Sequence, residues 1–396
     1  MSRLEYGVPD RERKISQDCK LKAETKAKTK SEKSELVVLM NGASSHRNPS
    51  APRVIIILGQ TGSGKSSLAV QVAQLLGSVI ISADAFQVYK EFSVASDKIC
   101  NEDMGGVNHF GLDLVPPTEE FTVKNYLSCI LPVIDTELRA GRSPVVVGGT
   151  NMYIEKLLFT SRLDEDDAVH PDRSLPSSCA RVDSFEHLAE MDPVMASRLH
   201  PNDQRRVLRA IDYFYVTGCR MSEKLRNQSR KLRWPNILVV CKRTGDACAE
   251  TLDEVETKKR KISVDPFQAN LEAKIKRRIE EKMLCGGKLK AELYRIGDLV
   301  SAGKLRWNKG ILQAIGYREF EPFVTRLCEK GAEDQALFYQ GVADLLRDTI
   351  QYSKKQKKWI RKLESMIEIF HCSDFECMQN LIMDEKLSSV KDIPRW

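Results

Sequence analysis

The sequence predicts an α/β fold in which a parallel sheet has helices on both of its faces. Three observations lead to this expectation. Short runs of β-branched and aliphatic residues recur at 54–58, 79–82, 144–147 and 236–240. Helical patterns such as 122–139 separate these runs, which is the alternation typical of parallel sheets buried on both faces. The third observation is a glycine-rich loop that joins the first run to a helical segment at 67–76.

The glycine-rich loop at 59–66 fills the pattern G-x-x-x-x-G-K-[ST] at every fixed position. Strand, loop and helix N-terminus together direct backbone N–H groups and the positive end of a helix dipole at one point. Lys65 adds a positive charge, and the hydroxyl of Ser66 is placed to bind Mg²⁺. We therefore expect a P-loop NTPase-like fold whose polyphosphate contacts are Gly59, Thr61, Gly62, Ser63, Gly64, Lys65 and Ser66. Which polyphosphate binds is not determined, because hydrolases, kinases and transferases share the loop.

Two further polar residues follow strands of the predicted sheet. Asp84 comes after the run 79–82, and Thr150 comes after a pair of glycines that ends the run 144–147. Ligands of parallel sheets bind at the carboxyl ends of strands, so both residues are expected beside the phosphate loop. From its position, Asp84 could organise Mg²⁺, act as a general base or cap a helix that begins at Phe86.

The chain divides into five expected segments. We expect a disordered polar lead-in at 1–50, a first part of the core at 51–160 and a small helical insertion domain at 161–199. A second part of the core with largely helical character follows at 200–365, and a C-terminal tail at 366–396.

The composition limits the classes of protein. The longest apolar runs are about five residues, too short for a membrane helix. Residues 1–30 contain acidic side chains and no apolar stretch, which argues against a secretory or mitochondrial signal. The 11 cysteines include no C-x-x-C pair, which favours a reducing compartment. Four consecutive basic residues at 258–261 are a candidate nuclear import signal.

Positive charge is concentrated near the C-terminal end of the predicted core. Residues 341–363 hold seven cations and two anions, an excess of five in a chain whose net charge is +7, and Tyr352 and Trp359 lie among them. Such clusters are typical of contacts with a nucleic-acid backbone, although a solvated helix face has the same composition. Arg205 and Arg209 share one helix face, which favours a bound anion there.

Five motifs in a fixed order resemble the tRNA dimethylallyltransferase family. They lie at 59–66, at 81–84 with 87–89, at 147–153, at 199–203 with 205–206, and at 313–320. The basic segment 354–359 is similar to the last basic helix of that family. The likeness covers roughly residues 53–363, and Gln313 matches the eukaryotic branch. The chain departs from the family at Ala85, where serine is common, and at 91–93, where a Gly-Leu-Asp-like run is preferred.

The resemblance implies transfer of a dimethylallyl group from its diphosphate to N6 of adenosine 37 beside the anticodon of tRNA. It implies that the loop binds the donor diphosphate with Mg²⁺ as cofactor. Among the catalytic residues, Asp84 matches the general base and Thr150 the residue beside the bridging oxygen, while Lys65 and Arg278 match diphosphate contacts. It assigns tRNA contacts to Asp84, Ala85, Phe86, Gln87, Asp203, Gln204, Arg205, Arg206, Gln313, Gly316, Arg318, Lys354, Lys355 and Lys358.

The partners implied are dimethylallyl diphosphate and the anticodon stem-loop of tRNA, bound by a monomer. The expected location is the cytoplasm, with the mitochondrion and the nucleus as candidate additional compartments. Three other functions stay open: prenylation of free AMP, ADP or ATP, a small-molecule P-loop kinase, and an RNA-binding homologue that has lost transfer activity. The basic segment 354–362 argues against free adenylates as the acceptor.

Overall fold

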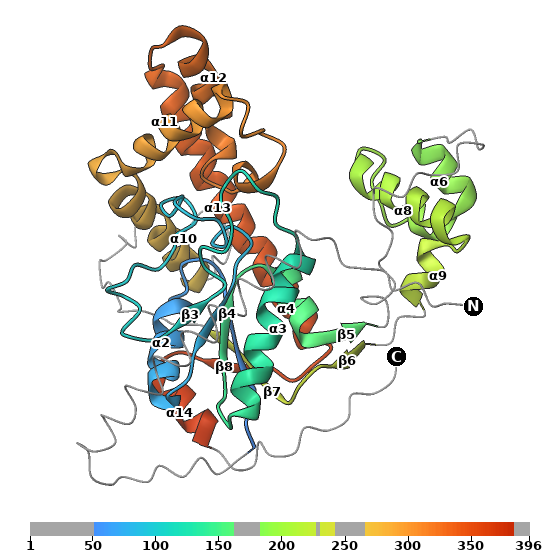
Figure 1. Ribbon diagram of the computed structural model, residues 1–396, viewed down its shortest axis with the longest axis vertical. Coiled ribbons are helices and arrows are strands. Elements are labelled where there is room, and N and C mark those ends of the chain that lie inside the picture. Colours follow the sequence, from blue (N-terminus) through green and yellow to red (C-terminus); the bar gives the residue numbers. More distant parts are fainter. Residues whose placement is uncertain (1–50, 162–182, 227–229, 242–265, 384–396) are drawn as a thin grey trace, which may run out of the picture. The chain divides into compact units, whose positions relative to one another are not determined.

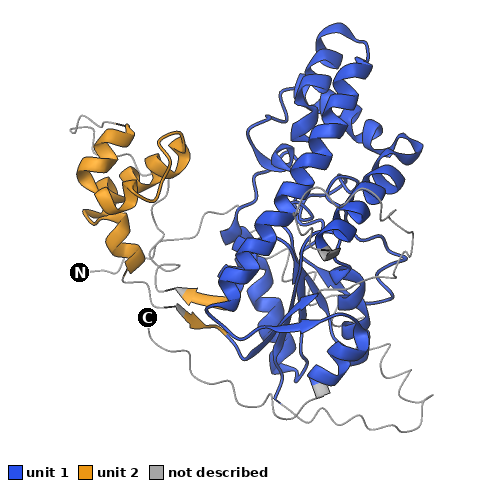
Figure 2. Cartoon of the chain, turned by 180° about the vertical axis from the view of Figure 1, so that it is seen from behind, with its two compact units in different colours: residues 1–157, 234–391 blue, residues 158–233, 392–396 orange. Residues whose placement is uncertain are grey.

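The structure is a computed structural model that describes residues 51–161, 183–226, 230–241 and 266–383 (Figure 1). These residues form two compact units (Figure 2). The larger unit is made of the described residues up to Leu157 and from Trp234 onward, and the inserted unit extends from Leu158 to Arg233. The expected lead-in 1–50 and the basic stretch 258–261 lie outside the described residues.

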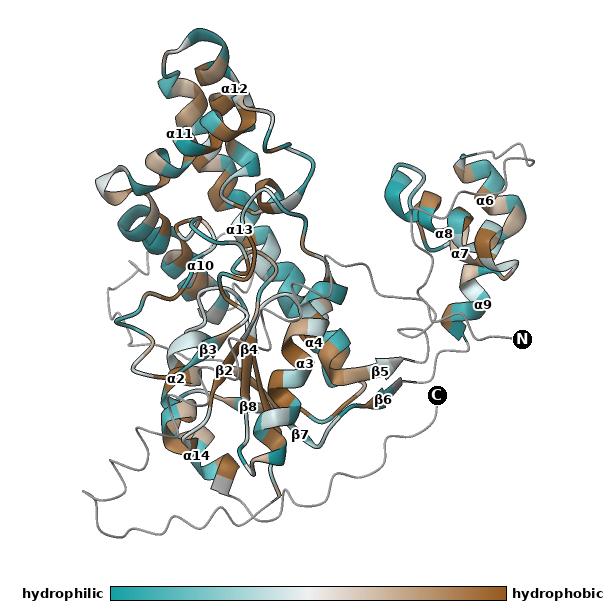
Figure 3. Ribbon diagram, viewed as in Figure 1, coloured by the Kyte–Doolittle hydropathy of each residue, from teal (hydrophilic) through white to brown (hydrophobic). Residues whose placement is uncertain are grey.

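The larger unit is built on a six-stranded sheet in the order β3-β2-β4-β1-β7-β8. Every pairing in it is parallel. The strands are β1 (Val54–Leu58), β2 (Ile80–Ala83), β3 (His109–Phe110), β4 (Val145–Gly148), β7 (Asn236–Cys241) and β8 (Phe370–Cys372). The central strands are largely apolar, as the brown colour in Figure 3 shows, and β1, β2 and β4 are buried along their whole length. The predicted parallel sheet is therefore confirmed, with its four predicted strands in place.

Helices cover both faces of this sheet, as predicted. Helix α2 (Lys65–Leu76) lies on one face together with α14 (Phe375–Met383), and α3 (Val123–Arg139) and α4 (Asn151–Leu158) lie on the other (Figure 1). Helix α3 begins where the sequence indicates, because the Thr122 hydroxyl accepts a hydrogen bond from the Asn125 N–H at 3.3 Å and the Asn125 side chain accepts one from the Thr122 N–H at 2.9 Å. No helix in the described part of the chain is both long and apolar enough to span a membrane.

The segment expected as a C-terminal tail completes the sheet instead. Strand β8 pairs with β7 in the register Val239↔Phe370 and Cys241↔Cys372. Cys372 and Met378, on β8 and α14, are buried in the same core cluster as α2. A strand of three residues has too little periodicity to be recognised locally, so its place in the sheet depends on tertiary contacts.

A helical region follows β7 in the larger unit. It contains α10 (Pro266–Arg278), the π-helix η2 (Ile279–Leu284), η3 (Cys285–Gly287), α11 (Lys288–Ser301), η4 (Gly310–Gln313), η5 (Arg318–Phe320), α12 (Glu321–Lys330) and α13 (Gln335–Glu364). Helix α13 is 30 residues long and is capped by Asp334, whose carboxylate accepts hydrogen bonds from the N–H groups of Ala336 and Leu337. Its N-terminal half packs against α11 and α12, and its C-terminal half runs towards the sheet (Figure 1).

The inserted unit contains a helical cluster and a short antiparallel pair of strands. The strands are β5 (Phe159–Ser161) and β6 (Arg230–Leu232), and the helices are α6 (Phe185–Met191), α7 (Pro193–Ala196), α8 (Gln204–Thr217) and α9 (Met221–Arg226). Val207 and Ile211 of α8 are buried against Leu188 of α6. Because α8 supplies this core, the inserted unit extends well beyond the boundary that the sequence suggested at residue 199.

Candidate active site

A cavity of about 710 Å³ lies in the larger unit. Its lining begins with residues that follow the carboxyl ends of β1, β2 and β4, and is completed by residues of the helical region. The lining includes Thr61, Gly62, Gly64, Lys65, Ser66, Asp84, Ala85, Phe86, Gln87, Thr150, Arg278, Gln313, Arg318 and Tyr352. Most of the residues singled out in the sequence are thus brought to one place. The hydrogen bonds around the cavity join residues that are up to 295 positions apart in the sequence.

The phosphate loop has the conformation that its glycines permit. Gly62 has φ +81° and Gly64 has φ +83°, values that side chains other than glycine rarely adopt. Gly64 is the N-cap of α2, so the helix begins at Lys65 and its N-terminus faces the cavity lining. A loop of this shape at a helix N-terminus binds phosphate groups.

Asp84 and Lys65 both line the cavity, and the charge of each affects the pKa of the other. Burial raises the pKa of Asp84, while the hydrogen bond from the Phe86 N–H and the charge of Lys65 act in the opposite direction. Burial also lowers the pKa of Lys65, and the charge of Asp84 opposes that shift. A carboxylate whose pKa is raised is a stronger base and is suited to accept a proton. No helix begins at Phe86, so capping a helix is not the role of Asp84.

Thr150 is tied directly to the segment that carries Asp84. Its Oγ1 accepts a hydrogen bond from the Ala85 N–H at 3.0 Å, and its own N–H donates to the Ala83 carbonyl at 3.2 Å. This close approach requires glycine at position 148, because a Cβ there would overlap the Ala83 carbonyl. The hydroxyl of Thr150 and the carboxylate of Asp84 are therefore held in a common wall of the cavity.

Arg278, the last residue of α10, reaches the phosphate loop. Its Nη1 donates to Thr61 Oγ1 at 3.0 Å and to the Asp97 carboxylate at 2.8 Å. Its buried Nε has no hydrogen-bond partner among the described residues. The resemblance assigns Arg278 to the diphosphate, and in the structure its side chain contacts the phosphate loop. Asp97 was not singled out in the sequence.

Gln87 connects the strand β2 to the segment that contains Asp97. Its Oε1 accepts from Ser82 Oγ at 2.8 Å, and its Nε2 donates to the carbonyls of Ser96 and Asp97 at 3.1 and 3.2 Å. The side chain lines the cavity as well. Gln87, which the resemblance assigns to tRNA, therefore has hydrogen-bond partners within the protein for both its amide oxygen and its amide nitrogen.

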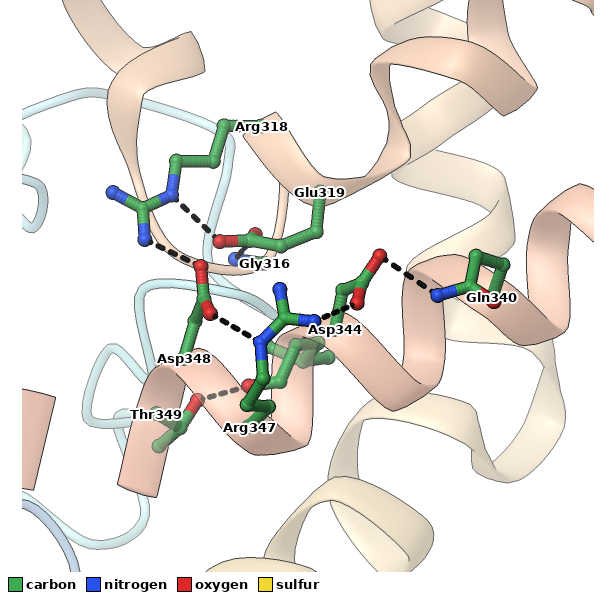
Figure 4. Close-up of polar contacts among 9 residues, drawn as sticks. Gly316, Arg318, Glu319, Gln340, Asp344, Arg347, Asp348 and Thr349 are labelled. Atoms are coloured by element: carbon green, nitrogen blue, oxygen red, sulfur yellow. Dashed lines mark hydrogen bonds and ion pairs between the residues drawn. The ribbon is translucent and has the colours of Figure 1, made fainter. Parts of the chain in front are cut away.

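Arg318 lies at the rim of the cavity within a group of ion pairs (Figure 4). Its Nε donates to Glu319 at 2.6 Å, and its Nη2 donates to Asp348 of α13 at 2.8 Å. Gly316 has φ +107°, and its N–H donates to the second carboxylate oxygen of Glu319 at 2.7 Å. Gln313 is exposed and bonded to the Asn308 carbonyl. Gly316 thus contributes a turn, while Gln313 and Arg318 supply side chains to the lining.

Helix α13 presents two different faces. Lys355 and Lys358 are exposed, and Lys354 pairs with Glu272 of α10 at 3.0 Å. The opposite face buries Ser353 and Gln356, which were not singled out in the sequence. The signal for them was present: positions 345, 349, 353, 356 and 360 form one helical stripe, and polar residues within an apolar stripe indicate buried hydrogen bonds.

The four assigned residues of α8 and its cap belong to the inserted unit, whereas the cavity is lined by the larger unit. Asp203 caps α8 by accepting a hydrogen bond from the Arg206 N–H at 3.3 Å, and its carboxylate also accepts from Arg206 Nε at 2.6 Å. The Arg206 side chain holds the pKa of Asp203 below its usual value. Gln204 and Arg205 are exposed at the start of α8.

The fold and the cavity define a class: an α/β protein whose glycine-rich loop at a helix N-terminus has the form of a P-loop. Residues 87–363 match the family described as IPP transferase. A tRNA dimethylallyltransferase of Bacillus licheniformis is 30% identical over 323 residues, which cover 79% of this chain and 89% of the relative. One from Staphylococcus aureus is 26% identical over 353 residues, 87% of this chain and 100% of the relative.

Solved structures agree with this grouping. A eukaryotic dimethylallyltransferase acting on tRNA superposes with a TM-score of 0.62 at 26% identity, covering 84% of this chain and 78% of that chain. A tRNA isopentenylpyrophosphate transferase from Staphylococcus epidermidis shares the fold, with a TM-score of 0.50 at 24% identity over 84% of this chain and 97% of that chain. The chain belongs to the IPP transferase family.

Proposed function

We propose that this chain transfers a dimethylallyl group from dimethylallyl diphosphate to N6 of adenosine 37 in tRNA and releases diphosphate. The observation that carries this proposal is the cavity in which the phosphate loop, Asp84, Thr150 and Arg278 meet. A phosphate-binding loop with a half-buried carboxylate close by provides both halves of the reaction, a neutralised leaving group and a proton acceptor. The names of the relatives supply the substrate class.

The leaving group is the diphosphate of the donor. The N–H groups at the N-terminus of α2, the ammonium of Lys65 and the guanidinium of Arg278 are proposed to hold its negative charge, and both side chains line the cavity. These donors are oriented before the reaction begins, so they stabilise the charge that develops as the C1–O bond breaks without further reorganisation. Thr150, in the facing wall, is proposed to donate its hydroxyl hydrogen towards the bridging oxygen.

The nucleophile is the exocyclic nitrogen of adenine. As N6 forms the new bond to C1 of the dimethylallyl group, a proton leaves N6, and Asp84 is proposed to accept it. The raised pKa of Asp84 makes its carboxylate a stronger base than an exposed aspartate. The adenine must leave the stack of the anticodon loop to reach this depth, which is the usual solution for enzymes that modify a base.

Mg²⁺ is proposed as the cofactor. No cluster of three or more His, Cys, Asp or Glu side chains suited to a metal ion exists among the described residues, so the protein offers the Ser66 hydroxyl rather than a complete ligand set. This fits Mg²⁺, which prefers a few protein oxygens together with substrate phosphates and water. When bound, the ion would neutralise charge on the departing diphosphate.

The tRNA is proposed to contact the rim of the cavity and the exposed face of α13. Arg318 and Gln313 lie at the rim, and Lys355 and Lys358 extend from the helix. Contacts of lysines to phosphates position a nucleic acid without reading its sequence, whereas contacts at the cavity select the extruded base. The activity of the relatives on tRNA also favours a cytoplasmic location, and the monomeric state stays a prediction.

A prenylation assay tests the proposal directly. The chain is incubated with dimethylallyl diphosphate, Mg²⁺ and either a tRNA that has adenosine at position 37 or free AMP, and the nucleosides are analysed by mass spectrometry. We expect a mass gain of one dimethylallyl group on tRNA and none on AMP. Product from AMP alone would favour an adenylate prenyltransferase, and tRNA binding without product would indicate a homologue that has lost transfer activity.

A further inference from the structure

The buried face of α13 contacts the phosphate loop itself. Ser353 is 0% exposed and Gln356 is 2% exposed. The Gln60 side chain donates to Ser353 Oγ at 2.9 Å and to the Ser353 carbonyl at 3.1 Å. A helix whose other face carries exposed lysines is thus bonded to the loop that is proposed to hold the leaving group.

Gln356 joins two walls of the cavity with one amide group. Its Oε1 accepts a hydrogen bond from the Thr61 N–H at 2.9 Å, and its Nε2 donates to the Gly149 carbonyl at 3.0 Å. Thr61 belongs to the phosphate loop, and Gly149 directly precedes Thr150. The Tyr352 hydroxyl, one turn earlier, donates to the same Gly149 carbonyl at 2.8 Å.

This bridge begins where the sheet ends. Strands β1 and β4 are paired as far as Ile57↔Val147. Beyond this pair, β1 leads into the phosphate loop and β4 leads into the Gly149–Thr150 turn. The Gln356 amide spans this opening. A Cβ at Gly149 would overlap Gln356 Nε2, so the glycine permits the approach. Thr61 is held twice, by Gln356 at its N–H and by Arg278 at its hydroxyl.

We propose that Gln356 is a positioning residue that sets the spacing between the phosphate loop and the Thr150 turn. The proposal rests on the function proposed above, because that spacing decides how the leaving group faces Thr150 and Asp84. Gln356 itself does not line the cavity, so it acts through Thr61 and Gly149 rather than by touching the substrate. A displacement of about 1 Å in such a site lowers turnover by about 100-fold.

A glutamate at this position provides a reversible test. In Gln356→Glu, an ionised carboxylate accepts from the Thr61 N–H but cannot donate to the Gly149 carbonyl. Burial raises the pKa of a carboxyl group, so lowering the pH protonates it and restores the missing donor. Lys65, Asp84 and Tyr352 are the titratable groups around this turn, and the charge of Lys65 opposes the rise in the pKa of the new carboxyl group. All three groups are present in wild type as well, so the wild-type pH profile measured in parallel reports their own titration.

The assay measures turnover on tRNA and the affinity for inorganic pyrophosphate with Mg²⁺, by calorimetry, between pH 6 and pH 8.5. For Gln356→Glu we expect both quantities to be about 10-fold below wild type at pH 8.5 and to approach wild type at pH 6. Gln356→Met, which fills the volume without either hydrogen bond, should lose about 10- to 100-fold in turnover at every pH. Gln335→Glu, an exposed glutamine at the start of the same helix, is the control and should match wild type throughout.

The outcomes separate this inference from the proposed function. Wild type that binds pyrophosphate but prenylates no tRNA contradicts the proposed function, and the pyrophosphate series then decides on Gln356 alone. A ratio for Gln356→Glu that does not change with pH in either measurement would overturn the positioning role. Wild-type affinity of Gln356→Met for pyrophosphate, together with wild-type turnover, would overturn it as well. Failure of the wild type to bind pyrophosphate would contradict the proposed diphosphate site, and the turnover series then decides on Gln356 alone.

Discussion

Asp97 places a negative charge at the edge of the proposed diphosphate site. Its carboxylate pairs with Arg278 at 2.8 Å, and the side chains of Arg278 and Asp97 are 18% and 43% exposed. A diphosphate that engages Arg278 must compete with this carboxylate. The substitution Asp97→Asn removes the charge and keeps the shape, and asparagine tolerates the left-handed backbone at this position, where φ is +48°.

The size of the effect follows from the exposure of the pair. A partly exposed ion pair contributes about 0.2–1 kcal/mol, since solvent screens it. Releasing Arg278 from that pair should therefore tighten the binding of pyrophosphate by about 1.4- to 5-fold, given that 1.4 kcal/mol corresponds to about tenfold. The charge of Asp97 also raises the pKa of Asp84, so Asp97→Asn should move the acidic limb of the profile of kcat/KM to lower pH.

Calorimetric titration with pyrophosphate and Mg²⁺ measures the first effect. The matched control is Asp113→Asn, since Asp113 also has a left-handed backbone, with φ +51°, and its carboxylate pairs with Lys98 at 2.7 Å, although it does not line the cavity. We expect no change in pyrophosphate affinity for this control. Equal or weaker affinity of Asp97→Asn would contradict competition between Asp97 and the ligand, and would place Asp97 among the groups that assist the ligand.

Three further predictions follow from the same geometry. Asp84→Asn should lower turnover by about 10²–10⁴-fold, and unchanged turnover would remove Asp84 as the base. Glu91→Gly should stabilise the fold by about 1 kcal/mol in urea unfolding, because Glu91 has φ +74° and its exposed ion pair with Arg295 contributes little; a loss of stability would contradict this. Lys355→Ala and Lys358→Ala should each reduce the salt dependence of tRNA binding by about one charge, and an unchanged slope would place that lysine off the RNA.

The elements with local signals were predictable. Strands β1, β2, β4 and β7 are apolar runs, α3 has a capping box, and the phosphate loop has a fixed pattern of glycines. Because the carboxyl ends of parallel strands share one edge, the sequence also predicts that Asp84 and Thr150 lie beside the loop. The pairing of Thr150 with the Asp84 segment, through the Ala85 N–H, agrees with that expectation.

The departure of residue 91 from the family pattern has a local consequence for the backbone. Glu91 stands where the family prefers glycine, and its backbone is left-handed. The resemblance to the family identifies the position, but only the backbone angle shows that the substitution has a conformational cost there.

Composition and short motifs therefore determined the class of fold, the phosphate loop and the carboxylate beside it, because each depends on residues within one strand, turn or helix start. Only the tertiary structure shows that β8 is an edge strand of the sheet and that α8 belongs to the inserted unit. It alone also shows that Gln356 bonds to the phosphate loop and Asp97 to Arg278. These contacts join residues as far as 181 and 295 positions apart. These contacts form because whole helices and strands pack against one another, so no local sequence pattern indicates which residues will be partners.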